Sequence, residues 1–137
     1  MEKVMQKKVR DVMSRGVVTV GMDAPVKEII DSLLEEHITG LVVTAPNGEA
    51  MGVISDRDII NVAGYAIREL TADDIMNSSV KDVRPDMTLG DAVEIMKREK
   101  VHRLLVLSED TSHARHGMIP VGILSASDIL REIARNL

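Results

Sequence analysis

The sequence predicts an α/β sandwich, an α+β arrangement in which helices cover a small sheet, and it predicts this unit twice. One observation is an internal repeat: residues 11–13 return as residues 74–76, and residues 52–60 return as residues 122–130. Another is that short β-branched runs alternate with helical segments in each copy. Copies this short are not expected to be stable alone. We therefore predict tandem βαββα units, related by a pseudo-twofold axis and packed through their sheets.

The first predicted unit spans residues 1–66 and begins with an N-terminal helix. A β-branched run at residues 17–20 predicts a short strand. Asp23 and Pro25 then predict a helix start, with Asp23 as the N-cap. The spacing of apolar residues in that helix predicts a buried stripe. Its members are Ile29, Ile30, Leu33 and Leu34.

A hairpin and a closing helix complete the first unit. Apolar runs at residues 41–43 and 51–54 predict paired strands, and the Asn47-Gly48 turn between them is a strong hairpin signal. The closing helix is expected to begin near Ser55.

The second predicted unit, residues 67–137, repeats this order. A capping sequence at residues 71–74 opens a helix, and residues 80–83 predict a short strand. Asp86 is the predicted N-cap of the next helix. The hairpin has a longer polar loop than in the first copy, at residues 108–117. In the helix that follows Asp86, the residues predicted to face inward are Leu89, Ala92, Val93 and Met96. Hairpin strands at 104–107 and 119–124 and a closing helix at 128–134 come next.

Composition limits the chemistry available to this chain of 137 residues. Hydrophobic residues make up 45% of it, but the only aromatic side chain is one Tyr, so the core must be aliphatic. The absence of Cys excludes disulfides, cysteine-ligated metal centres and thiol catalysis. No apolar run approaches the roughly 20 residues of a membrane span. No signal peptide is evident, and a cytoplasmic protein with no membrane contact is the expectation. A net charge of −5 argues against nucleic acid as a partner.

The repeated motifs resemble those of the cystathionine-β-synthase (CBS) domain, and their tandem arrangement resembles a CBS pair, or Bateman module. The motifs are Asp-hydrophobic-Met at the start of each copy, an apolar hairpin, and Gly-x-hydrophobic-Ser-x-x-Asp at the end. The resemblance covers about residues 9–135. Val42 and Leu105 stand where the family often has Pro, which is a backbone preference and not a ligand contact.

The resemblance implies a regulatory module that binds an adenine nucleotide (AMP, ADP or ATP), or S-adenosylmethionine or NAD, in clefts between its units. A module of this kind senses energy status or a metabolite, and modulates an attached or separate protein. Here the regulated partner is expected to be a separate polypeptide, and the chain is expected to form a homodimer. No catalytic arrangement is evident, so we do not expect an enzyme.

Ser55 and Asp58, with their counterparts Ser125 and Asp128, have two interpretations. Ser-x-x-Asp between a strand and a helix is close to a capping box, which satisfies exposed N–H groups at the helix start. Alternatively, a carboxylate can accept hydrogen bonds from both hydroxyls of a ribose, as the family resemblance implies, while the Ser and the exposed N–H groups of the first helical turn hold a phosphate. Both can hold, with Ser as cap and Asp as ligand group.

His102 and Arg103 resemble a His-Arg pair that contacts phosphate in the family. The alternative is a solvated Arg beside a surface His. The guanidinium suits phosphate, whereas the matching Thr39 and Gly40 carry no charge, so we expect two unequal clefts. By the family pattern, the tighter site combines residues of both copies. Its predicted members are Ser55, Asp58, His102 and Arg103, with Arg57 either a further phosphate contact or an exposed helix-start residue.

The adenine base would need an apolar slot, for which four residues match family positions. Plain core packing is the alternative interpretation for each of them. They are Val20, Val53, Val83 and Ile123.

His113 and His116 form a His-x-x-His pair that could in principle bind a metal. A polar loop is the simpler interpretation, and we predict no metal site. A dimeric scaffold or interaction protein with vestigial pockets is the main alternative to the regulatory module. An enzyme with unrecognised chemistry is a third.

Overall fold

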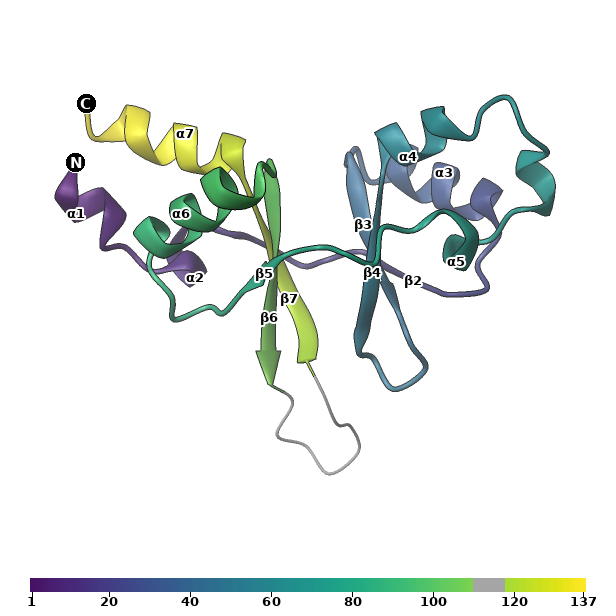
Figure 1. The fold of residues 1–137 in the computed structure, drawn as a ribbon, viewed down its shortest axis with the longest axis horizontal. Coiled ribbons are helices and arrows are strands. Elements are labelled where there is room, and N and C mark those ends of the chain that lie inside the picture. The colour runs from purple at the N-terminus through teal and green to yellow at the C-terminus, as the bar shows by residue number, and fades with distance from the viewer. Residues whose placement is uncertain (110–117) are drawn as a thin grey trace. The chain divides into compact units, whose positions relative to one another are not determined.

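The computed structural model describes residues 1–109 and 118–137, and these residues form two compact units. The unit that we call the terminal unit holds both ends of the chain and contains residues 1–17, 81–109 and 118–137. The middle unit contains residues 18–80. Figure 1 shows a small sheet and several helices in each unit, which confirms the predicted α/β class.

The compact units divide the chain differently from the sequence repeat. Residues 1–17 belong to the first copy but pack in the terminal unit, and residues 67–80 belong to the second copy but pack in the middle unit. Each copy therefore lends its leading segment to the unit built on the other copy. The boundaries at 1–66 and 67–137 remain a prediction about the repeat, as does the packing of the two units through their sheets.

The terminal unit contains a sheet with the strand order β1-β7-β6-β5. β5 runs parallel to β6, and β6 forms an antiparallel hairpin with β7. Figure 1 shows α6 and α7 on one side of this sheet. The elements are α1 (Glu2–Met5), α2 (Val9–Val12), β1 (Ser14–Arg15), β5 (Asp82–Val83), α6 (Leu89–Glu99), β6 (Arg103–Glu109), β7 (Met118–Ser125) and α7 (Ala126–Arg135).

The middle unit has the same topology on a three-stranded sheet with the order β2-β3-β4. β2 is parallel to β3, and β3 forms an antiparallel hairpin with β4. The predicted turn is confirmed, since Gly48 has a φ of +88° and its N–H donates to the carbonyl of Ala45 at 2.8 Å. The elements are β2 (Thr19–Gly21), α3 (Val26–Glu35), β3 (Gly40–Thr44), β4 (Ala50–Ser55), α4 (Asp56–Asn61), the 3₁₀ helix η1 (Ile67–Glu69) and α5 (Ala72–Ile75).

Two predicted helix starts are wrong. Asp23 is not the N-cap of α3, because Pro25 holds that position and no side chain caps the helix. Asp86 is not the N-cap of α6, because Thr88 and Asp91 form a complete capping box there. A Thr three residues before an acidic side chain satisfies the N–H groups of the first turn from both directions, so it displaces the earlier Asp.

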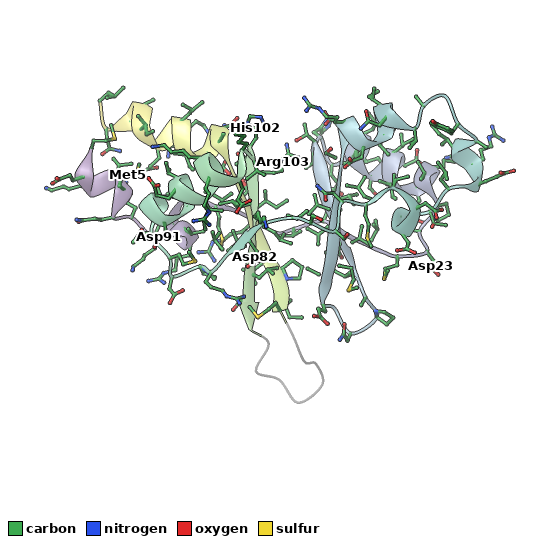
Figure 2. The ribbon with its side chains drawn as sticks, viewed as in Figure 1. Met5, Asp23, Asp82, Asp91, His102 and Arg103 are labelled. Carbon is green, nitrogen blue, oxygen red and sulfur yellow. The ribbon has the colours of Figure 1, made fainter. Side chains whose placement is uncertain are left out.

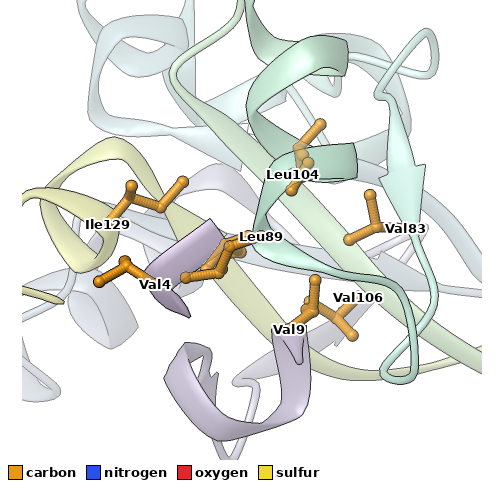
Figure 3. Close-up of a cluster of buried hydrophobic side chains, with 9 residues drawn as sticks. Val4, Val9, Val83, Leu89, Leu104, Val106 and Ile129 are labelled. Atoms are coloured by element: carbon orange, nitrogen blue, oxygen red, sulfur yellow. The ribbon is translucent and has the colours of Figure 1, made fainter. Parts of the chain in front are cut away.

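Each unit has its own aliphatic core between helices and sheet. Figure 3 shows that Val4 and Val9 of the leading segment pack with residues of the second copy, among them Leu89, Leu104 and Ile129. In the middle unit, the predicted stripe of α3 is confirmed at the buried Ile29 and Leu33, and Ile30 is half-buried. The prediction is wrong for Leu34, which is 69% exposed. No helix in the described part of the chain has the length and apolar character needed to cross a membrane.

The repeated Gly and Met motifs are packing partners. In the terminal unit, a Cβ atom added to Gly122 would lie 2.6 Å from the carbonyl oxygen of Ser14 and 2.8 Å from the sulfur of Met13. In the middle unit, a Cβ atom at Gly52 would lie 2.9 Å from the sulfur of Met76. The leading segment of each copy therefore crosses the strand of the other copy at the one residue without a side chain.

We expect Gly122→Ala to lower the free energy of unfolding by about 1–3 kcal/mol, because the added methyl group must push a backbone segment away. Gly64→Ala is the matched control, since nothing lies within 4 Å of its added Cβ. That variant should be neutral or stabilised by up to about 1 kcal/mol. Urea unfolding measures both, and equal stability of the two variants would refute the steric account.

A buried carboxylate on α7 binds a lysine of the first leading segment, residues 1–17. The ammonium of Lys7 donates to Glu132, which is buried, and Arg135 approaches the other oxygen of the same carboxylate at 3.4 Å. The hydrogen bond from Lys7 lowers the pKa of Glu132 below its ordinary value of 4.5, against the opposing effect of burial. Because the folded protein holds this carboxylate ionised, the contribution to stability is present above pH 4.5 and is lost as the pH falls through the lowered pKa.

Glu132→Gln should therefore lower the melting temperature at neutral pH, and the difference from the wild type should shrink as the pH falls below 4.5. Asp31→Asn is the control, since Asp31 pairs with Lys27 on an exposed face of α3. Such surface pairs contribute little, so this variant should melt close to the wild type. A pH-independent gap for Glu132→Gln would contradict the role assigned to the ionised form.

Candidate functional site

Ser55 and Asp58 lie where β4 ends and α4 begins. The Asp58 carboxylate accepts hydrogen bonds from the backbone N–H of Ser55 at 2.8 Å and from its hydroxyl at 3.1 Å, both at Oδ2. The Ser55 hydroxyl in turn accepts the N–H of Asp58 at 3.4 Å. The capping interpretation is therefore confirmed here. Asp58 is half-buried, and its Oδ1 accepts no hydrogen bond from the described part of the chain.

Ser125 and Asp128 form the equivalent capping box where β7 meets α7, with hydrogen bonds of 2.9 Å and 3.1 Å. Here the second carboxylate oxygen is also occupied. Asp128 Oδ1 accepts a hydrogen bond from the guanidinium of Arg131 at 2.6 Å, and Asp128 is only 7% exposed. Both aspartates thus act as helix caps through Oδ2, but they differ in whether Oδ1 is available to a ligand.

The residues before each hairpin lie beside these capping boxes. The carbonyl of His102 accepts the N–H of Ala126 at 2.8 Å, and Arg103 pairs with Ser125. Figure 2 labels His102 and Arg103 together at this end of β6. His102 is exposed and Arg103 is half-buried.

The middle unit has the same backbone arrangement, with uncharged residues in the places of His102 and Arg103. The carbonyl of Thr39 accepts the N–H of Asp56 at 2.9 Å, and Gly40 pairs with Ser55. The structure thus brings Thr39 and Gly40 to Ser55 within one unit, and His102 and Arg103 to Ser125 within the other. The predicted set of Ser55, Asp58, His102 and Arg103 draws on both units and stays a prediction.

Arg57 is exposed on the first turn of α4. Its backbone N–H donates to the carboxylate of Asp56 at 2.8 Å, and its guanidinium makes no ion pair within the described residues. A role for Arg57 as a phosphate contact stays a prediction.

The four predicted apolar slot residues differ in burial. Val83 is buried within the core cluster of the terminal unit, and Val20 packs against the core of the middle unit, so core packing describes both. Val53 is buried on β4 but lies outside that cluster, and Ile123 is half-buried on β7. A role beside an adenine base stays a prediction for each.

A pocket of about 450 Å³ in the terminal unit contains none of the predicted site residues. Two arginines, Arg10 and Arg84, line it with Asp86 and Ser108. Sequence reasoning missed it because its walls come from the leading segment, the loop after β5 and the hairpin, which only the fold brings together.

Arg131 is a further residue that sequence reasoning missed. Its signal was present, since an Arg three residues after an Asp on one helix face places the two side chains within reach of each other. His113 and His116 lie outside the described residues. Within residues 1–109 and 118–137, no three potential ligand side chains gather as a metal site would require.

Comparison with known proteins places the chain in a family. The family model of the CBS domain matches residues 9–65 and again residues 72–135. The chain belongs to this family and carries two tandem copies of the domain, as the repeat predicts.

Three similar proteins illustrate the range of the family. The 5'-AMP-activated protein kinase subunit gamma-3 of Sus scrofa is 29% identical over 131 residues, which are 87% of this chain, and the chain spans only 24% of that protein. The crystal structure of CBSX2 in complex with AMP has a TM-score of 0.75 at 25% identity and covers 94% of this chain and 97% of its own. The CBS domain pair of protein MJ0100, solved with 5'-methylthioadenosine and S-adenosyl-L-methionine, has a TM-score of 0.79 at 21% identity. It covers 96% of this chain and 98% of its own, and it shows the shared fold.

Proposed function

We propose that this chain is a regulatory module that binds an adenosine-containing ligand and alters a separate partner protein according to its bound state. AMP, ADP and ATP are the first candidates, with S-adenosylmethionine and NAD as others. Binding would shift the chain toward the conformation for which the ligand has the higher affinity, and the partner would respond to that conformation. The module would act without catalysis, as a cytoplasmic homodimer.

The similarity to CBSX2 carries this proposal, because that structure holds AMP and resembles nearly the whole of this chain. The relationship to a kinase subunit named for its activation by AMP supports the same ligand class. The carboxylate of Asp58 adds chemical support, since one oxygen is held by the capping box and the other faces no described donor. A fixed acceptor of this kind suits the hydroxyls of a ribose.

The proposed contacts divide by chemistry. Asp58 would accept the ribose hydroxyls, and Ser55 would hold its carboxylate in place through the capping box. Arg103, with His102 beside it, would supply positive charge for the phosphate. Energy sensing would follow from a preference among AMP, ADP and ATP at these charges.

A scaffold with vestigial pockets is the second candidate, and one observation favours it. Both Ser-x-x-Asp motifs act as capping boxes, so helix capping alone accounts for their presence in both copies. A scaffold would show no thermal shift with any of the five ligands, and Asp58→Ala combined with Asp128→Ala would leave its dimerisation intact.

The first test measures ligand binding by calorimetry and by thermal melting. A ligand of this site at 100 times its Kd should stabilise the fold by about 2.7 kcal/mol. Asp58→Asn should weaken binding about 10- to 100-fold, because a neutral amide replaces a charged acceptor.

Asp74→Asn is the matched control for that variant. Asp74 forms the same capping box with Thr71, with hydrogen bonds of 2.8 Å and 3.1 Å, so it loses the same helix cap. Ligand affinity should not change, because Asp74 is not a proposed contact. Parallel losses in the two variants would mean that Asp58 serves the helix alone.

The second test separates phosphate from adenosine. Arg103→Ala should weaken AMP about tenfold or more while leaving adenosine nearly unaffected, because only AMP carries the charge that a guanidinium contacts. Arg98→Ala, on an exposed face of α6, controls for the loss of one positive charge. Calorimetric titrations of both ligands decide, and equal losses for AMP and adenosine would reject the phosphate role.

A further inference from the structure

We infer that Arg131 keeps Asp128 from binding a ribose, so that the chain holds one adenosine ligand tightly and not two. This inference rests on the proposed function, because it concerns which of the two aspartates a ligand can use. It assigns to Arg131 a role in setting stoichiometry, which neither the family match nor the repeat implies.

The two carboxylates differ in the oxygen that the capping box leaves over. Asp58 is half-buried, and its Oδ1 meets no donor in residues 1–109 and 118–137. Asp128 is 7% exposed, and its Oδ1 already accepts a hydrogen bond from Arg131 at 2.6 Å. A ribose needs acceptors for its hydroxyls, so at Asp128 it would have to displace the Arg131 guanidinium, a donor with a full positive charge, whereas a hydroxyl donor carries none.

The repeat places a different residue beside each of the two carboxylates. Aligning Asp58 with Asp128 places Asn61 opposite Arg131, because each lies three residues after its aspartate. The side chain of Asn61 is a neutral amide, so it cannot form an ion pair with Asp58. The first copy therefore lacks the group that occupies the carboxylate in the second.

Arg131 can be replaced without disturbing the core, because its side chain is largely exposed to solvent. Its side chain is 63% exposed, whereas the carboxylate that it contacts is buried. Removing the guanidinium should leave the capping box intact, because that box uses Oδ2 and the Ser125 hydroxyl. An i,i+3 ion pair that merely supports α7 is the competing explanation, and it predicts no effect on binding.

The test counts AMP bound per chain by calorimetry. The wild type should bind one equivalent tightly, and Arg131→Asn should gain a second equivalent whose affinity rises about tenfold or more over any binding there in the wild type. Asn61→Arg should weaken the first equivalent by a similar factor, because the new guanidinium can pair with Asp58. Adding Asp128→Asn to Arg131→Asn should remove the second equivalent again.

Arg135→Ala is the matched control. Arg135 lies on the same helix and pairs with Glu132 at 3.4 Å, so its loss removes a comparable exposed charge without touching Asp128. Its stoichiometry should remain one. Two tight equivalents in the wild type, or an unchanged single equivalent in Arg131→Asn, would overturn the inference and leave the proposed function standing. Folded protein that binds none of the five ligands in any variant would overturn both.

Discussion

The close approach of a leading segment to a glycine is the constraint on which both units depend. Only a residue without a side chain lets Met13 and Ser14 pass against β7, and Met76 and Asn77 pass against β4. The backbone of Asn77 then exchanges two hydrogen bonds with Val53, and β1 pairs with β7. In the terminal unit this contact adds β1 to the sheet, and in the middle unit it forms an isolated bridge beside β4. In the terminal unit, Val4 and Val9 of the leading segment are buried in the core.

Local signals predicted most of the secondary structure, because they depend on neighbouring residues. The Asn47-Gly48 turn needs only a positive φ at Gly48, and the capping boxes at Ser55, Ser125 and Thr71 need only a partner three residues on. The exchange of leading segments could not be predicted in this way. Both copies carry the same Gly and the same Met, so the sequence does not reveal which Met meets which Gly; long-range packing decides that.

The candidate site shows the same division between local and distant information. The pairing of Ser with Asp at both helix starts was predictable, and the structure confirms its capping role. The difference between the two aspartates was not predicted, although Arg131 lies only three residues after Asp128, because this spacing permits an ion pair but does not decide whether an exposed guanidinium turns to the carboxylate or to solvent. Sequence similarity to family members suggested which residues should share one ligand. That grouping joins distant parts of the chain, so it depends on more than local pattern.

The exchange of segments has a consequence for how such a chain could arise. A single-copy ancestor, with its own leading segment and its own glycine strand, could close its sheet by accepting that segment from a second molecule. Gene duplication followed by fusion would then convert an intermolecular exchange into an intramolecular one. After fusion, the two copies are free to diverge, since each now occupies a fixed place. The change from Asn61 to Arg131 is a difference of the kind that a symmetric dimer of identical chains could not have carried on one side only.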